Sequence, residues 1–134
     1  MNVKSYVFAV IASYFAMAIA GVVSDLATRE QMASLLMISR GEEGMAAMMG
    51  WMLFGYLVST ILFCYIFVKG RDSGGVGEGV RFGSIFGVAM CGPILVNYSI
   101  FPYEMIAMVT QAVLTVLIYI IGGIVASLVY KPAQ

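Results

Sequence analysis

The sequence has no histidine, only two cysteines and few charged side chains. Of its 134 residues 10% are charged and 62% are hydrophobic, whereas about a quarter of an average soluble domain is charged. Without histidine the chain lacks the commonest general base and the usual axial ligand of haem. These absences argue against a soluble enzyme or a haem protein. A chain with so much apolar sequence is expected in a lipid environment.

Charged residues are also absent from four long runs, residues 5–24, 45–68, 82–103 and 105–130. About 20 apolar residues in a helix cross a hydrocarbon core of about 30 Å. We therefore predict a single all-α domain over residues 1–134, an integral membrane bundle of four transmembrane helices at about 5–24, 45–68, 80–101 and 104–130. The first run also fits a secretory signal that ends in small residues, but we expect it to remain as a helix.

The distribution of lysine and arginine predicts how this bundle is oriented. Arg29 and Arg40 would lie on one side of the membrane, and five basic residues would lie on the other: Lys4, Lys69, Arg71, Arg81 and Lys131. Since cytoplasmic loops carry an excess of basic residues, both termini and the loop 69–81 are expected in the cytoplasm.

Two connections between the runs could form structure of their own. The outer connection, residues 25–44, contains an apolar stretch at 31–39 that fits either a short interfacial helix or an extension of the first helix. The loop 69–81 is rich in glycine, but its spacing matches no nucleotide-binding motif and no strand precedes it. We interpret it as a flexible turn.

Small residues recur at helical spacing in the second half of the chain. Because small residues let helices approach closely in lipid, we expect the third and fourth helices to cross at these positions. A proline inside the third helix removes a backbone hydrogen bond that neighbours must cover, which predicts that this helix is central. The predicted packing residues are Gly79, Gly83, Gly87, Gly92, Pro93, Gly122, Gly123 and Ala126.

No charged residue lies within the four runs, so the polar candidates there are amides. Asn97 and Gln111 flank the outer turn between the third and fourth helices at comparable depth. They fit a hydrogen bond between the two helices, or a contact to a substrate or partner subunit. Neither a serine nor a cysteine has a visible base partner. We predict no catalytic residue and no cofactor.

Six of the eleven methionines fall near the outer ends of the second and fourth runs. Thioethers suit Cu(I), but methionine is also an adaptable packing residue. The cluster is therefore either a soft-metal site or apolar packing, and no other metal site is predicted. Its members are Met45, Met48, Met49, Met52, Met105 and Met108.

The second half of the chain resembles a group of small, uncharacterised bacterial inner-membrane proteins with four helices. The similarity rests on the segment 77–83 (GEGVRFG) with Gly87, on Pro93, Tyr98 and Pro102, and on the final Tyr130, Lys131 and Pro132. The resemblance implies a multi-pass protein of the bacterial cytoplasmic membrane. It implies no activity, cofactor or site residue.

Together these features predict a non-catalytic accessory or structural subunit of a larger membrane complex. Its expected partners are membrane lipids and other integral membrane subunits or further copies of itself, and its balanced charge gives no basis for binding nucleic acid. The alternative is a small homo-oligomeric transporter or channel, with Cu(I) as one candidate substrate.

Overall fold

The computed structural model describes residues 2–72 and 74–131, and this part of the chain is helical with no strand. Ser73 of the glycine-rich loop and Pro132 of the C-terminal motif lie outside the described residues. The helices are α1 (Val3–Ala27), α2 (Ala33–Met37), α3 (Gly41–Ala47), α4 (Met49–Gly70), α5 (Val76–Ile100) and α6 (Met105–Val129). Four of them, α1, α4, α5 and α6, are long and apolar enough to cross a membrane.

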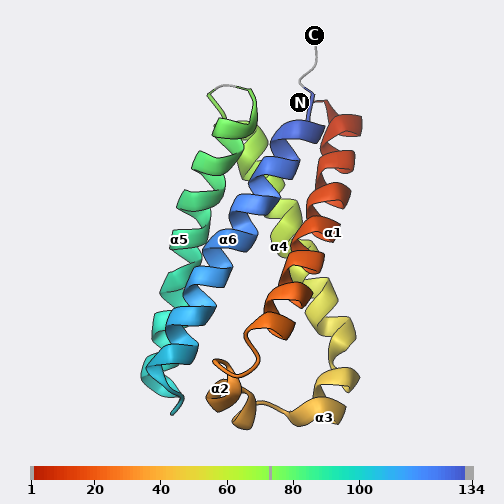
Figure 1. Ribbon diagram of the computed structural model, residues 1–134. Helices are drawn as coiled ribbons and strands as arrows, with labels where there is room; N and C mark the ends of the chain where they lie inside the picture. Colours follow the sequence, from red (N-terminus) through yellow and green to blue (C-terminus); the bar gives the residue numbers. More distant parts are fainter. Residues whose placement is uncertain (1, 73, 132–134) are drawn as a thin grey trace.

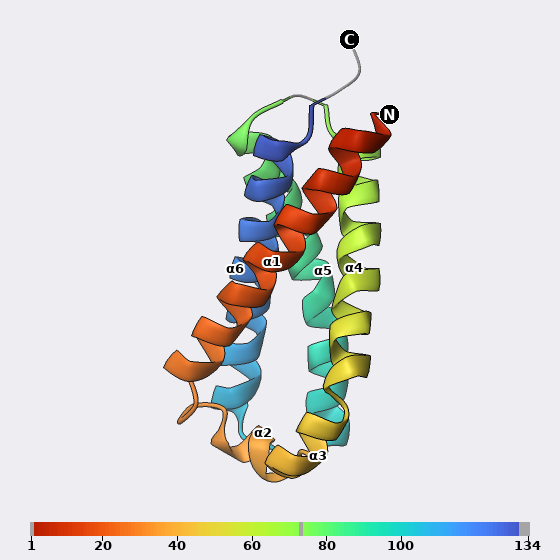
Figure 2. The ribbon, with the colours of Figure 1, turned by 90° about the vertical axis from the view of Figure 1, so that its right-hand side faces the viewer.

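The four long helices run roughly alongside one another, with both termini at one end (Figure 1). The loop between α4 and α5 lies at that same end, and α2, α3 and the turn between α5 and α6 lie at the other (Figures 1 and 2). We call the half of the bundle with the termini the terminal half, and the half with α2 and α3 the α2–α3 half.

Helix α6 is the central helix of the bundle. It packs along α5 and against α1, and it also touches α4 and α2. The expectation that the third transmembrane helix, α5, would be central is wrong, because α5 packs mainly on α6. Pro93 lies inside α5 without ending it, and the residue is exposed. The proline therefore faces away from the other helices and does not require them to surround it.

Two helix boundaries differ from those expected. Helix α5 begins at Val76, about four residues earlier than expected, after Gly75 adopts a φ of 100° that favours glycine. The polar segment before the second transmembrane helix forms α3, so α4 begins at Met49 and not at about 45. The short helix expected within 31–39 is present as α2.

The buried core lies in the terminal half. Phe63, Cys64 and Phe67 of α4 are almost completely buried, together with Val10 of α1 and Ala126 of α6. The core therefore joins three helices at one end of the bundle.

Candidate functional site

Glycines bring α5 and α6 into backbone contact. A Cβ added to Gly79 would collide with the Gly123 carbonyl, and one added to Gly83 or Gly87 would lie 2.7 Å from a Cα atom of α6. Real Cβ atoms essentially never approach so closely. These positions therefore leave no room for a side chain, as small-residue contacts between membrane helices require.

The neighbouring face of α6 receives α1. A Cβ on Gly122 would lie 2.5 Å from the Met17 sulfur, and the Ser13 hydroxyl donates a hydrogen bond of 3.1 Å to the Gly122 carbonyl. Ala126 is fully buried one turn further on. Consecutive glycines of α6 thus serve two different helices, Gly123 facing α5 and Gly122 facing α1.

The remaining two predicted packing residues lie elsewhere. Gly92 and Pro93 are exposed, and an added Cβ on Gly92 would meet nothing within 4 Å. Within the described part of this chain, they take no part in the contact between α5 and α6.

The two polar candidates of the membrane region do not meet. Asn97 is exposed on α5 and Gln111 is half-buried on α6. Among the described residues no hydrogen bond joins their side chains, so the expected bond across the helical hairpin is not formed. Tyr103 links the hairpin there instead, because its buried hydroxyl donates to the Ile94 carbonyl at 3.3 Å.

The six methionines are spread over three helices. Met45 belongs to α3, the residues at 48, 49 and 52 surround the start of α4, and Met105 and Met108 begin α6. The first five of these methionines are 41–62% exposed. Since α4 and α6 touch only sparsely, a soft-metal site would need side chains from separate parts of the α2–α3 half. The described residues hold no cluster of histidine, cysteine or acidic residues suited to a metal.

In the terminal half, aromatic rings fill the space between α4 and the pair formed by α5 and α6. The Phe63 ring lies 5.2–5.3 Å, centroid to centroid, from the rings of Phe82, Phe86 and Tyr119. Phe67 stacks edge-on against Phe82 at 5.3 Å. The sequence analysis missed this cluster, although Phe63 and Phe67 on α4, and Phe82 and Phe86 on α5, each stand one helical turn apart.

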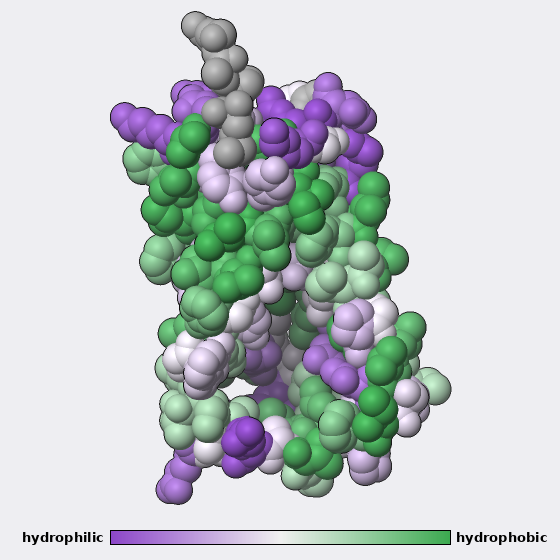
Figure 3. Space-filling view, turned by 180° about the vertical axis from the view of Figure 1, so that it is seen from behind, coloured by the Kyte–Doolittle hydropathy of each residue, from purple (hydrophilic) through white to green (hydrophobic). Residues whose placement is uncertain are grey.

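The opposite half is open. Every residue of α4 from 49 to 59 is exposed, and the helix diverges there from α1 and α6 (Figure 2). Figure 3 shows the molecule from behind, with a hollow in this half that contains hydrophilic side chains. A hydrogen bond of 3.4 Å from the Tyr14 hydroxyl to the Leu53 carbonyl still links α1 to this part of α4.

The outer surface where α3 meets α4 carries a shallow groove of about 610 Å³, lined by Ala47 of α3 and by Gly50, Trp51 and Phe54 of α4. Trp51 is 74% exposed, so it does not pack inside the bundle. Phe54 precedes the buried Phe63 by nine residues, which at about 100° per residue places the two on opposite sides of the helix. Part of the groove therefore faces away from the protein's own core.

Ionic and polar contacts fix the terminal half where α5 begins. The buried Glu78 carboxylate accepts two hydrogen bonds from the Arg81 guanidinium, at 2.5 and 3.1 Å. Arg81 also pairs with Asp72 at 3.4 Å. Arg71 lies over the Tyr130 ring, 5.1 Å from its centroid. The loop between α4 and α5 is thus held by side chains and does not act as a free glycine linker.

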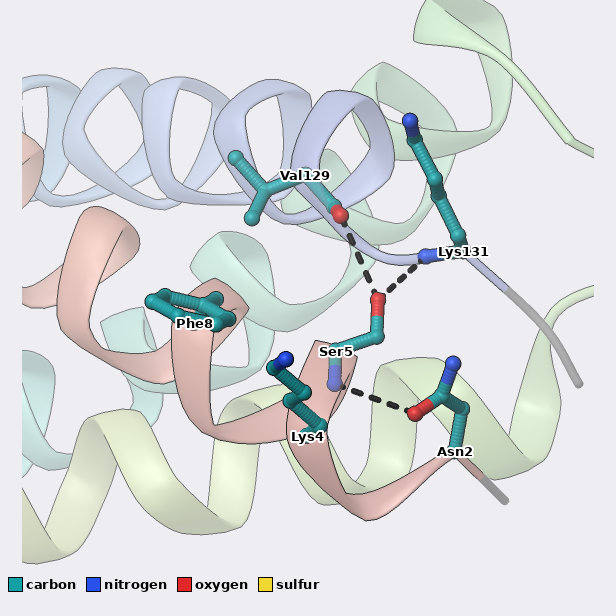
Figure 4. A pocket seen from close by; sticks show the side chains of 6 residues that line it. All are labelled: Asn2, Lys4, Ser5, Phe8, Val129 and Lys131. Atoms are coloured by element: carbon teal, nitrogen blue, oxygen red, sulfur yellow. Dashed lines mark hydrogen bonds between the residues drawn. The ribbon is translucent and has the colours of Figure 1, made fainter.

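A second depression, of about 270 Å³, lies between the start of α1 and the end of α6 (Figure 4). Its lining combines two lysines with apolar and hydroxyl side chains: Asn2, Lys4, Ser5, Phe8, Val129 and Lys131. The sequence showed the two lysines but not that the termini meet.

Comparison with protein-family models, with curated proteins and with solved structures gave no match for this chain. The structure itself shows an all-α bundle with four helices able to cross a membrane. The function of the protein is inferred from the surfaces of this bundle.

Proposed function

We propose that the protein is a non-catalytic accessory or structural subunit of a larger complex in the bacterial cytoplasmic membrane. The observation that carries the proposal is the first half of α4, where residues 49–59 are all exposed yet include small residues suited to helix packing.

Glycine has a different environment in the two halves of the bundle. In the terminal half, the backbone of α6 occupies the space that a side chain at Gly79 or Gly83 would need. On α4, an added Cβ at Gly50 or Gly55 would meet nothing within 4 Å. Interior glycines lower helix stability by roughly 0.5–1 kcal/mol relative to alanine in water. In a membrane protein they are useful where another helix approaches closely, and for α4 that helix must come from another chain.

The groove on α4 adds shape to this surface. Trp51 and Phe54 stand edge to face with centroids 6.4 Å apart, beside the small residues Ala47 and Gly50. Exposed aromatic residues next to small ones form the pockets in which interface anchors bind. One turn after Trp51 comes Gly55, and one turn after that comes Ser59, which extends the same face towards mid-membrane.

The placement in the membrane follows from charge and from the resemblance of the second half to small bacterial inner-membrane proteins. Five basic residues lie at the chain ends, in the α4–α5 connection or in the helix turns next to it, against Arg29 and Arg40 in the connection from α1 to α3. The excess of basic residues in cytoplasmic segments then favours both termini inside. A reporter fused at the C-terminus should be active in the cytoplasm, and activity only outside the cell would contradict this topology.

Gentle extraction of native membranes followed by native mass spectrometry tests the proposal. We expect a stoichiometric assembly with other subunits. A Gly55→Leu substitution should abolish the mass peak of this assembly. It should leave the thermal stability of the isolated chain unchanged, because a Cβ at this position meets no other residue of the chain within 4 Å. The matched control is Gly92→Leu, which also adds bulk in open space but on α5. A lone monomer from native membranes, or equal loss with both variants, would reject the subunit role of α4.

A homo-oligomeric transporter or channel is the second candidate, and the hollow with hydrophilic side chains in the α2–α3 half supports it (Figure 3). The rings around Phe63 close the terminal half, so conduction would require them to separate. A homo-oligomer in native mass spectrometry, with solute flux reduced by Asn97→Leu and Gln111→Leu, would favour this function. For Cu(I) as substrate, calorimetric titration without saturable binding would remove the methionine site.

A further inference from the structure

The depression between the start of α1 and the end of α6 has a fixed polar frame. The Ser5 hydroxyl accepts a hydrogen bond of 2.6 Å from the Lys131 backbone N–H and donates one of 3.4 Å to the Val129 carbonyl. The Asn2 side-chain oxygen accepts a hydrogen bond from the Ser5 backbone N–H at 3.2 Å, and the Asn2 backbone N–H donates one to the Tyr130 hydroxyl at 3.3 Å. These bonds hold the two ends of the chain together, so the depression is part of the fold.

The two lysines of this depression lie on either side of Ser5 (Figure 4). Neither Lys4 nor Lys131 makes an ion pair with another described residue. The acidic residues of the α4–α5 connection and of the first turn of α5, Asp72 and Glu78, pair with Arg81. Two cations thus line one depression, and no anionic side chain among the described residues pairs with either of them.

Apolar side chains continue from the lysines into the bundle. Phe8 follows Lys4 by one helical turn, about 6 Å along α1, and is 55% exposed. Val129 lies beside it at the end of α6, and its side chain is half-buried. The order from the chain ends towards the membrane is therefore cation first and hydrocarbon second, which matches the order of phosphate and acyl chain in a phospholipid.

We propose that this depression binds an anionic phospholipid. Its phosphate lies between the ammonium groups of Lys4 and Lys131, and its acyl chain runs along Phe8 and Val129. The site is independent of the surface of α4, which lies in the other half of the bundle. A free phosphate ion shares the charge but not the hydrocarbon, so the apolar side of the depression distinguishes the two ligands.

The experiment is native mass spectrometry of the full chain released from nanodiscs that contain phosphatidylglycerol and phosphatidylcholine in equal amounts. We expect selective retention of phosphatidylglycerol. Each basic residue near an anionic headgroup contributes about fivefold to binding. Lys4→Gln and Lys131→Gln should therefore each reduce the selectivity about fivefold, and the double variant about 25-fold. The control is Lys69→Gln, an exposed lysine of the same half outside the depression.

Two further measurements separate a lipid from an anion alone. Phe8→Ala should weaken retention of phosphatidylglycerol, and millimolar inorganic phosphate should not displace the lipid. Unchanged selectivity in the double lysine variant would overturn the proposal, as would an equal loss in Lys69→Gln, which would mean attraction to the general surface charge. Displacement by inorganic phosphate, with Phe8→Ala unaffected, would identify an anion site and reject the lipid. Thermal unfolding of each variant confirms that the bundle is intact.

Discussion

The two halves of the bundle use the same kinds of residue in opposite ways. In the terminal half, glycines are pressed against backbone and Phe63 and Phe67 are buried. In the α2–α3 half, Gly55 has open space around it, and Trp51 and Phe54 are 74% and 58% exposed. The difference shows that α4 is packed against its own bundle in one half only, since Tyr103 and Ala107 of the α5–α6 hairpin are buried in the other half as well. The other end retains residues suited to packing without an internal partner.

The contrast arises because α4 follows the bundle for half its length. Its second half is held by aromatic rings that reach across to α5 and α6. Its first half turns only one aromatic ring, Tyr56, to the side on which Phe63 is buried, and this ring is 56% exposed. This half of α4 follows directly on α3. The opposite end of the α5–α6 hairpin is instead covered by α2, where the Glu104 backbone N–H donates to the Ser34 hydroxyl at 3.0 Å. The long connection therefore covers α6 and leaves the first half of α4 exposed.

The largest effect should come from filling the contact between α5 and α6. In Gly83→Leu, the new side chain has no space, because its Cβ alone would lie 2.7 Å from the Ile120 Cα. Overpacking costs about 1–3 kcal/mol, occasionally more, and we expect at least the upper value since rigid backbone is displaced. Unfolding in detergent by increasing denaturant measures the loss. Gly92→Leu on the same helix should change stability little, and equal effects of the two would remove the distinction between the halves.

The second effect concerns the aromatic cluster. Phe63 is fully buried and touches three other rings, whereas Phe54 lies on the same helix in the open half. Phe→Ala in a water-soluble core costs about 3–5 kcal/mol, and in lipid we expect about 2 kcal/mol, because lipid solvates the separated rings as well. The same unfolding assay should show less than a quarter of that loss for Phe54→Ala. A comparable loss at Phe54 would show that α4 is packed along its whole length.

Much of the fold could be predicted from the sequence because charge is excluded from a bilayer. The uncharged runs located four membrane-length helices, and the repeat of Gly79, Gly83 and Gly87 indicated a face without side chains. The start of α5 was placed too late, since helix propensity counts glycine against a helix. The packing of Gly79 on Gly123 and the i, i+3 pairing of Glu78 with Arg81 stabilise those first turns. The contact with Gly123 joins segments far apart in the chain, so the local sequence does not show it.

The arrangement of the helices was harder to predict. Asn97 and Gln111 stand at comparable depth, but equal depth does not place two side chains on facing sides, and Asn97 is exposed. Pro93 suggested a central α5, although a proline that faces outward needs no surrounding helices. The open half of α4 could not have been predicted, because a helix face that meets lipid and one that meets protein are equally apolar.

The smallest effect is expected when a serine hydroxyl is removed from each half of the bundle. Ser13 is fully buried and donates to the Gly122 carbonyl, while Ser59 is exposed on the open half of α4. Hydrogen bonds between membrane helices contribute about 0.6 kcal/mol on average. Ser13→Ala should therefore lower unfolding stability by about that amount and loosen α1 against α6, which faster exchange of the amide hydrogens in that region would report. Ser59→Ala should leave both measurements unchanged for the isolated chain. If Ser59→Ala proved the more destabilising of the two, the open half would already be packed within a single copy, and its role as a surface for another subunit would have to be abandoned.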